Sequence, residues 1–206
     1  MNASRLTRSS NTKSHTTGPI NGLRRYIRPG KVYRREDLLT SSNSIDRHLR
    51  ELLDDGGLKK LAQGLYHAPR QSAFGVLPPD DSELVRAFLR DDHFLIFSPS
   101  SYNSLGLGTT QLYNTTIVYN HKRHGRFTFG NRTFDFRVKP RFPEKLTEQF
   151  LLIDLLNNLN DLAEDKTAIL DLVKRKLTIF QGKLKRALNT YASVATKKLI
   201  MEWMDA

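Results

Sequence analysis

Residues 42–69, SNSIDRHLRELLDDGGLKKLAQGLYHAP, place the strongest constraint on the fold of this chain of 206 residues. Apolar residues recur in the first half of the segment at the spacing that brings side chains to one face of an α-helix: Ile45, Leu49, Leu52 and Leu53. Short helices are only marginally stable in water by themselves, so that face must be covered. The segment must therefore pack on a core that neighbouring elements supply.

The second half of the segment is typical of a β-hairpin. Gly56 and Gly57 end the helix, and the following residues predict two short strands at 58–61 and 65–67. Between them, Gly64 can adopt the positive φ that a tight turn requires. The expected order is thus a helix and then a hairpin.

The residues before this segment predict two further helices. Ile20, Leu23 and Ile27 lie at helical spacing, and the sequence RPG at 28–30 ends that helix. An extended pair follows, then a short helix at about 35–39 and a turn, TSSNS, whose side chains can cap the next helix. Helix, short helix, turn, helix and hairpin in this order are typical of a winged helix-turn-helix domain.

A winged helix-turn-helix lays its third helix in the major groove of DNA, so the face opposite the leucines is the candidate base-reading surface. Arg47 and Arg50 can each donate two hydrogen bonds to guanine, and Asn43 can pair with adenine or a phosphate. Lysines of the hairpin suit phosphate contacts, as do two arginines that open the short second helix. The complete set of candidate DNA-binding residues is Arg34, Arg35, Ser42, Asn43, Ser44, Arg47, His48, Arg50, Lys59, Lys60 and Gln63.

The charge distribution favours a polyanionic partner, most simply nucleic acid. The chain has a formal net charge of +12. Residues 1–70 hold 14 Lys and Arg against 6 Asp and Glu, a balance of +8, which leaves +4 for residues 71–206. Two other interpretations stay open, because winged helices also bind proteins and a helix face with Arg and Asp is often merely solvated.

Residues 71–142 predict a small mixed α+β module. An amphipathic helix at about 84–89 follows a cap at Asp80 or Asp81. The stretch SPSSYNSLGLG is typical of a short serine-capped helix. The stretches HFLIF, NTTIVYN, GRFTFG and RTFDFRVKP are short and rich in β-branched or aromatic residues, as expected for antiparallel strands.

No pattern in the chain predicts an active site or a metal site. Ser100 and Ser101 lack the G-x-S-x-G surroundings of a serine nucleophile and are expected to cap a helix. His121 and His124 flank a Lys-Arg pair without further ligands at metal-binding spacing. Neither a glycine-rich phosphate loop nor a carboxylate pair stands out. We therefore expect a binding protein without catalytic residues, metal or cofactor.

Residues 143–206 predict three helices. The second is expected to end at Gln181-Gly182, and the third to extend to about Trp203. Basic residues lie on their outer faces, and the candidate partner-binding set is Lys174, Arg175, Lys176, Lys183, Lys185 and Arg186. These residues form either a solvated helix face or a docking surface for an acidic partner or the DNA backbone.

The start of the chain differs in composition from the rest. Residues 1–18 are rich in Ser, Thr, Asn and basic residues and predict a disordered arm. They lack the apolar stretch of a secretory signal, and no run in the chain approaches the length of a transmembrane helix. The chain contains no cysteine, which is compatible with a reducing compartment. A cytoplasmic location is expected.

Five stretches of the chain together resemble a known family: RPGKVYRREDLL, SIDRHLRELLDDGGLKKLAQGLYHAP, FGVLPPD, SPSSYNSLGLGTT and TFGNRTFDFRVKP. They are similar to the AbiEi-type antitoxins of the bacterial AbiE abortive-infection toxin–antitoxin systems, usually called type IV. The resemblance covers about residues 20–160 and is best at 57–69 and 104–108. Residues 165–206 match no motif of that family.

The resemblance implies a protein with two activities. In that family an N-terminal winged helix binds inverted repeats upstream of its own operon and represses it, while the C-terminal region counteracts a nucleotidyltransferase-like toxin. Carried over to this chain, the recognition-helix positions are Asn43, Ser44, Arg47 and Arg50, and the hairpin positions are 59–63. The basic residues at 174–186 occupy a place comparable to the positive residues linked to antitoxicity.

Together these observations predict an α+β protein with a winged helix-turn-helix at 19–70, a mixed module at 71–142 and a helical region at 143–206, the last two forming one antitoxin domain. The expected function is a DNA-binding autorepressor, bound to its inverted-repeat operator as a monomer or dimer, that also counteracts a nucleotidyltransferase-like toxin. The alternative is a winged-helix regulator that senses a ligand or partner and has no toxin. A nuclease that uses the winged helix only for docking is disfavoured, because no acidic cluster is evident.

Overall fold

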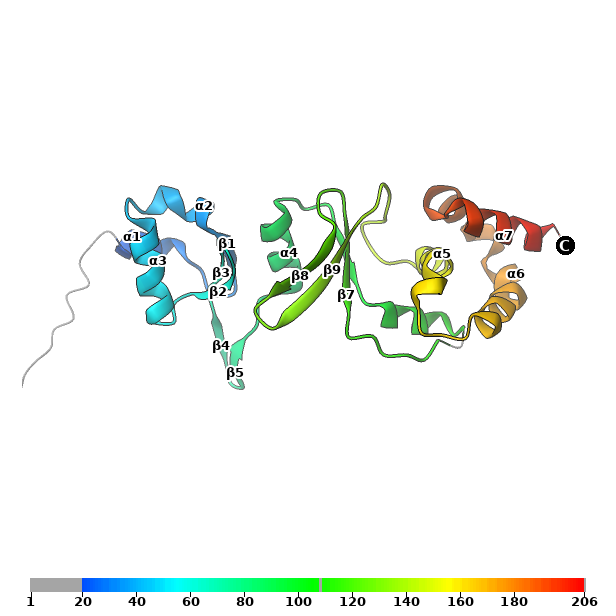
Figure 1. Ribbon diagram of the computed structural model, residues 1–206, viewed down its shortest axis with the longest axis horizontal. Helices are drawn as coiled ribbons and strands as arrows, with labels where there is room; N and C mark the ends of the chain where they lie inside the picture. Colours follow the sequence, from blue (N-terminus) through cyan, green and yellow to red (C-terminus); the bar gives the residue numbers. More distant parts are fainter. Residues whose placement is uncertain (1–19, 108, 206) are drawn as a thin grey trace, which may run out of the picture. The chain divides into compact units, whose positions relative to one another are not determined.

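The computed structural model describes residues 20–107 and 109–205, apart from the side chains of residues 178–183 (Figure 1). The expected disordered arm at residues 1–18 lies outside the described residues. The fold is a mixed α/β arrangement in which the chain divides into two compact units, one ending at Asp80 and the other beginning at Asp81. This division lies beyond the boundary expected after position 70, because a hairpin at residues 70–77 belongs to the first unit.

The first unit combines helices with a three-stranded antiparallel sheet of order β1-β3-β2. Its elements, in chain order, are α1 (Ile20–Tyr26), β1 (Val32–Arg34), α2 (Arg35–Leu38), the 3-10 turn η1 (Leu39–Ser41), α3 (Ile45–Asp54), β2 (Lys59–Ala62) and β3 (Leu65–His67). Gly64 forms the turn between β2 and β3 with a φ of +69°, as expected from its position. The helix and hairpin anticipated at 42–69 are therefore both present.

The apolar face of α3 anchors the core of the first unit. Ile45, Leu49 and Leu52 are buried, as their spacing predicts. They belong to one cluster with residues of the other helices and of the sheet: Ile20, Leu23, Leu38, Leu58, Tyr66 and Ala68. Full burial of an aliphatic side chain contributes about 1.5–3 kcal/mol, so this cluster fixes α3 in place and leaves its opposite face in solvent.

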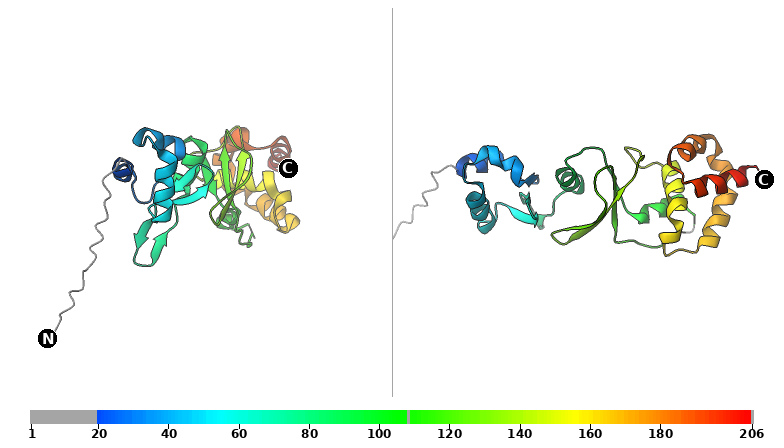
Figure 2. Two further views of the ribbon diagram at one scale, coloured as in Figure 1. Left: turned by 60° about the vertical axis from the view of Figure 1, so that its left-hand side comes forward. Right: turned by 45° about the horizontal axis from the view of Figure 1, so that its top comes forward.

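A separate two-stranded ribbon follows β3 directly. It consists of β4 (Arg70–Ser72) and β5 (Gly75–Leu77), which pair as an antiparallel hairpin and project from the rest of the first unit (Figures 1 and 2). These strands were not expected from the sequence, because RQSAFGVL lacks the alternation of apolar and polar residues that marks a half-buried strand.

The second unit contains a four-stranded sheet of order β6-β7-β9-β8. Its first elements are α4 (Asp81–Leu89), β6 (Leu95–Phe97), the 3-10 helix η2 (Pro99–Leu105), β7 (Thr116–Asn120), β8 (Gly125–Phe129) and β9 (Arg132–Val138). The expectation of antiparallel strands holds for β6–β7 and β8–β9 but is wrong for β7 and β9, which are parallel. β9 lies between β7 and β8, and this inner position buries its Phe134 and Phe136 completely.

Helices form the remainder of the second unit: α5 (Glu148–Asn158), the 3-10 turn η3 (Leu159–Asp161), α6 (Lys166–Tyr191) and α7 (Val194–Met204). α5 is the central helix, since every residue from 150 to 156 is buried. The expected helix end at Gln181-Gly182 is wrong, because α6 continues through both residues. One interior glycine costs a helix only about 1 kcal/mol. The buried residues on either side of it, Leu177 and Leu184, continue the apolar face.

Within the described part of the chain, none of the helices combines the length and the apolar character that crossing a membrane requires.

Candidate nucleic-acid interface and a second pocket

The solvent face of α3 carries most of the expected base-reading residues. Asn43, Ser44, Arg47 and Arg50 are all exposed around this helix. The Arg47 side chain is 65% exposed, and its only close carboxylate within the described residues is Glu51, at 3.9 Å from Nε to Oε1. An exposed pair at this distance contributes little, so the Arg47 guanidinium can exchange it for another acceptor.

Ser42 and His48 are buried, in contrast to the expectation that they contact DNA. Ser42 Oγ lies 2.6 Å from His48 Nδ1 and accepts the Ser44 backbone N–H at 3.2 Å. Arg47 Nη2 lies 3.3 Å from the other ring nitrogen of His48. At 100° per residue, His48 lies only about 60° from Ile45, on the flank of the apolar stripe, so helical geometry explains its burial. These two residues fix the start of α3 and orient Arg47.

The two arginines expected to hold phosphates are already paired with carboxylates. Arg35 Nε and Nη2 each donate to Asp46 at 2.7 Å, which joins α2 to α3. The hydrogen bond from Arg35 lowers the pKa of Asp46. Arg34 Nε lies 3.1 Å from Glu36 Oε2. Arg35 therefore holds the second and third helices together, whereas Arg34 pairs within the start of the second helix.

Lys59, Lys60 and Gln63 of the β2–β3 hairpin are exposed, as expected. Lys59 and Lys60 are neighbours in one strand and point to opposite sides of it, so they do not share a face. Lys59 lies opposite His67 of β3. The turn is fixed to the helices because the Arg35 backbone N–H donates to the Gly64 carbonyl at 2.9 Å.

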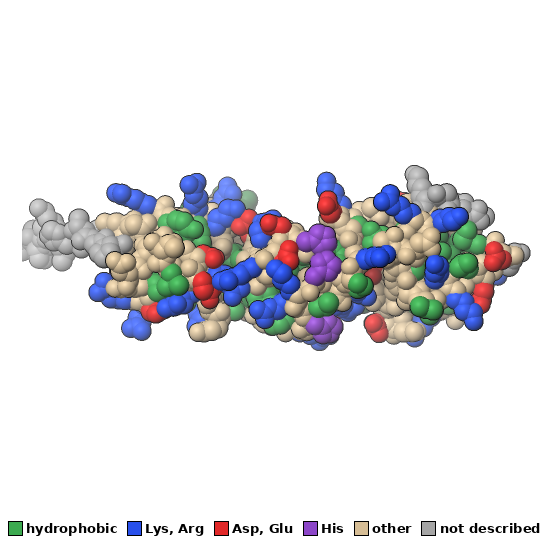
Figure 3. All heavy atoms as spheres, turned by 90° about the horizontal axis from the view of Figure 1, so that it is seen from above, with side chains coloured by type: hydrophobic (Ala, Val, Ile, Leu, Met, Phe, Trp, Pro, Cys, Tyr) green, Lys and Arg blue, Asp and Glu red, His purple; other side chains and the backbone are tan. Residues whose placement is uncertain are grey.

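The candidate partner-binding residues of α6 have different surroundings. Lys174, Arg175, Lys185 and Arg186 are exposed. Lys176 instead donates through Nζ to the Gly106 carbonyl at 2.7 Å, which ties α6 to the end of η2. The Lys183 side chain lies outside the described residues. Figure 3 shows several acidic side chains among the basic ones on the face that it draws.

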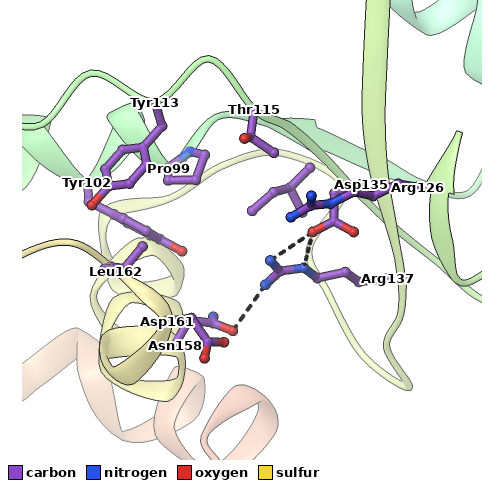
Figure 4. A pocket seen from close by; sticks show the side chains of 11 residues that line it. Pro99, Tyr102, Tyr113, Thr115, Arg126, Asp135, Arg137, Asn158, Asp161 and Leu162 are labelled. Carbon is purple, nitrogen blue, oxygen red and sulfur yellow. Dashed lines mark hydrogen bonds and ion pairs between the residues drawn. The ribbon is translucent and has the colours of Figure 1, made fainter. Parts of the chain in front are cut away.

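A pocket of about 130 Å³ opens on the second unit (Figure 4). It is lined by residues of η2, of the strands β7, β8 and β9, of the segment before β7 and of the turn after α5. Its charged residues are Arg126, Asp135, Arg137 and Asp161. Arg137 is held in place, because Nε and Nη2 lie 2.9 and 2.8 Å from Asp135 Oδ2 and Nη1 lies 3.4 Å from Asn158 Oδ1. Two tyrosines, three aliphatic side chains and the polar Thr115 and Asn158 complete the lining, which suits a small ligand with both a polar and an apolar part.

A buried carboxyl group lies behind Tyr102, one of the residues that line the pocket. Asp154 on α5 accepts a hydrogen bond from the Tyr102 hydroxyl at 2.7 Å and from the Tyr119 hydroxyl at 2.9 Å. Burial raises the pKa of Asp154, and the two tyrosine donors oppose that effect only in part. This group was missed in the sequence because the two tyrosines lie 52 and 35 residues before Asp154.

The serines and histidines considered for chemistry have structural surroundings. Ser98, and not Ser100 or Ser101 as expected, is the cap of η2, and its Oγ accepts the Ser100 backbone N–H at 3.3 Å. The His121 ring stacks on His93, with centroids 5.0 Å apart. The described residues contain no group of three or more His, Asp or Glu side chains that could hold a metal ion.

Comparison with known proteins identifies one family. A family model described as a family of unknown function, DUF6088, matches residues 24–179. No curated protein and no solved structure matches the chain. The matched residues include α3, the β2–β3 hairpin and the strands around the pocket. Since the match covers most of the chain and both of its units, the protein belongs to the DUF6088 family.

Proposed function

We propose that the protein is a DNA-binding transcriptional autorepressor that also acts as the antitoxin of a toxin–antitoxin pair. The first unit is then a winged helix-turn-helix domain, and the second unit carries the antitoxin activity. The observation that carries the DNA-binding half is the solvent face of α3, where Arg47 and Arg50 are exposed on a helix whose other face is buried.

The order of the elements supports a winged helix-turn-helix. α2 and α3 are separated by a short turn, and the strands after α3 form a hairpin that pairs with a strand before α2. An α-helix is about 10–12 Å wide with its side chains, which matches the major groove of about 12 Å. In this arrangement Arg47 and Arg50 reach base edges, and Lys59 or Lys60 neutralises phosphates.

The DNA-binding half is tested with DNA from upstream of the protein's own gene. We expect the wild-type protein to bind this DNA more tightly than a scrambled duplex in fluorescence anisotropy. The double variant Arg47→Glu/Arg50→Glu should lose this preference, because two acidic side chains would face the phosphates. The matched control Arg175→Glu/Arg186→Glu carries the same charge change on α6 and should retain the preference. Equal binding of the wild type to both duplexes would refute the proposal.

The antitoxin half is supported by the resemblance of the five quoted stretches to AbiEi-type antitoxins. It is also supported by a set of exposed basic residues of α6: Lys174, Arg175, Lys185 and Arg186. Such a face suits an acidic partner. Co-expression with a nucleotidyltransferase encoded by a neighbouring gene should restore growth. We expect Arg175→Glu/Arg186→Glu to lose rescue and Arg47→Glu/Arg50→Glu to keep it when expression is driven from an independent promoter. Rescue that is unchanged by the α6 variant would remove this face from the antitoxin role.

A second candidate function is a winged-helix regulator that senses a small molecule and has no toxin. The pocket beside Arg137 favours it, since a fixed guanidinium and the tyrosines that line the same pocket suit a small carboxylate with an apolar body. The sensor and the antitoxin are distinguished by measuring the thermal unfolding midpoint of the protein with benzoate and, separately, with benzylamine. Stabilisation by benzoate alone, lost in Arg126→Gln and accompanied by weaker DNA binding, would favour the sensor. A neighbouring nucleotidyltransferase gene would favour the antitoxin.

A further inference from the structure

The β4–β5 ribbon carries an aromatic side chain that the core of the first unit does not use. Phe74, in the turn of the ribbon, is fully exposed, and Val76 and Leu77 on β5 are also exposed. A two-stranded hairpin without a covered face is at best marginally stable in water. Its apolar tip is therefore available to a partner.

The turn is built to hold Phe74 outward. Ser72 Oγ accepts the Phe74 backbone N–H at 3.2 Å and donates to the Gly75 carbonyl at 2.8 Å. Gly75 adopts a φ of +110°, which other residues rarely tolerate. These two hydrogen bonds hold the backbone of the turn in one conformation, so the Phe74 ring is presented at the tip of the ribbon.

Basic side chains surround the base of the ribbon. Lys59 lies opposite His67, three residues before the ribbon begins. The Ala68 backbone N–H donates to the Lys31 carbonyl, and the Arg70 side chain lies against Gly30. The side chains of Lys31, Lys59 and Arg70 are all exposed. The sequence from 56 to 79 contains no Asp or Glu, so this region suits a polyanion.

We propose that the ribbon contacts DNA and that Phe74 enters the minor groove as a wedge between two stacked base pairs. Proteins that kink DNA combine such an apolar wedge with Arg, Lys, Asn or Gln beside it. Here Arg70 and Gln71 provide the polar contacts. Two paired strands are about 4.8 Å apart before side chains are added, and the minor groove is only about 6 Å wide. The groove must widen to admit the tip, so the bound DNA is bent.

This inference rests on the proposed DNA-binding function and adds a second contact to the one made by α3. It is tested with the full-length protein and end-labelled DNA from upstream of its own gene, using energy transfer between the labels to measure bending. We expect Phe74→Ala to lose the bend and to lower affinity by about tenfold, since the extra contacts that bent DNA permits are lost with the wedge. Phe74→Leu, which keeps an apolar wedge, should retain most of the bend.

Leu112→Ala is the control, because Leu112 is another highly exposed apolar residue and belongs to the second unit. It should leave both the bend and the affinity unchanged. DNA that is bound but straight, or a bend that persists in Phe74→Ala, would overturn the wedge and leave the proposed function standing. Failure of the wild type to bind any duplex would overturn both the wedge and the proposed DNA-binding function. Loss of self-association in Phe74→Ala, measured by light scattering with the bend unchanged, would assign the ribbon to a second copy of the chain and overturn the DNA contact.

Discussion

Arg47 and His48 are neighbours in the sequence, yet α3 gives them opposite surroundings. Arg47 is largely in solvent, whereas His48 is buried beside Ser42. We expect Arg47→Ala to cost about 1–3 kcal/mol of binding free energy on the cognate site and less on random DNA, because a bidentate contact to guanine discriminates between bases. Anisotropy titrations on both duplexes measure the difference, with Arg175→Ala as the control. Equal losses on the two duplexes would show that Arg47 contacts only phosphate.

The buried Ser42 side chain is expected to contribute to stability and not to base reading. Ser42→Ala leaves the Nδ1 atom of the buried His48 without its partner, which should lower the free energy of unfolding by about 1–3 kcal/mol. The control is Ser44→Ala. Ser44 precedes α3, is exposed and forms no capping hydrogen bond within the described chain. Urea unfolding of the two variants compares them, and similar midpoints for both would contradict the structural role.

The buried carboxyl group of Asp154 should make a contribution to stability that falls as the pH rises. Burial raises its pKa above the ordinary value of 3.8, so the folded state keeps the proton to a higher pH than the unfolded chain does. The stabilisation is therefore complete below about pH 3.8 and is lost as the pH rises through the folded-state pKa. Asp154→Asn keeps an oxygen acceptor for Tyr102 or Tyr119 and cannot ionise. The free energy of unfolding of Asp154→Asn, relative to that of the wild type, should therefore increase from pH 4 to pH 8. A difference that stays constant over this range would contradict the prediction.

Elements with local signals could be predicted from the sequence, and those that depend on distant partners could not. α3 follows from the spacing of Ile45, Leu49 and Leu52, and the turn at Gly64 from its freedom to adopt positive φ. The parallel pairing of β7 with β9 has no local signal, because it depends on which strand lies inside the sheet. The continuation of α6 through Gly182 depends on packing that outweighs a weak stop signal.

The same distinction applies to the candidate site. Arg47 and Arg50 could be assigned to the solvent face from helical geometry alone. The pairing of Arg35 with Asp46 joins two helices and could not be read from either one. The contact of Asp154 with Tyr102 depends on the whole second unit.

At the scale of the element, the start of α5 offers a direct test of the second unit. Thr147 is the cap of this central helix, and its side chain accepts the Phe150 backbone N–H at 3.2 Å. Because Thr147 is exposed, Thr147→Ala removes the cap without opening a cavity and should cost about 1 kcal/mol of stability. Thr167→Ala, in the exposed first turn of α6, is the control and should change the unfolding midpoint little. A midpoint for Thr147→Ala that matches this control would show that the cap is dispensable.

At the scale of the whole molecule, the candidate DNA-binding residues and the candidate partner-binding residues belong to different units. Most of the basic excess, +8 of +12, lies in the first 70 residues, whereas the pocket and the exposed lysines and arginines of α6 belong to the second unit. Variants of α3 and variants of α6 should therefore affect DNA binding and toxin rescue independently. The charge reversals Arg47→Glu/Arg50→Glu on α3 and Arg175→Glu/Arg186→Glu on α6 test this independence when both DNA binding and growth rescue are measured for each.

The net charge of +12 also predicts how DNA affinity depends on salt. Each phosphate that a lysine or arginine neutralises releases condensed counterions, so the logarithm of the binding constant falls linearly with the logarithm of the salt concentration. If Lys59 contacts a phosphate, Lys59→Gln should reduce that slope by about 1 and weaken operator and random DNA alike. Lys198→Gln removes the same charge from an exposed position on α7 and should leave the slope unchanged. Equal slopes for Lys59→Gln and wild type would place Lys59 outside the interface, and the phosphate contacts would then have to come from the other basic residues of the first unit.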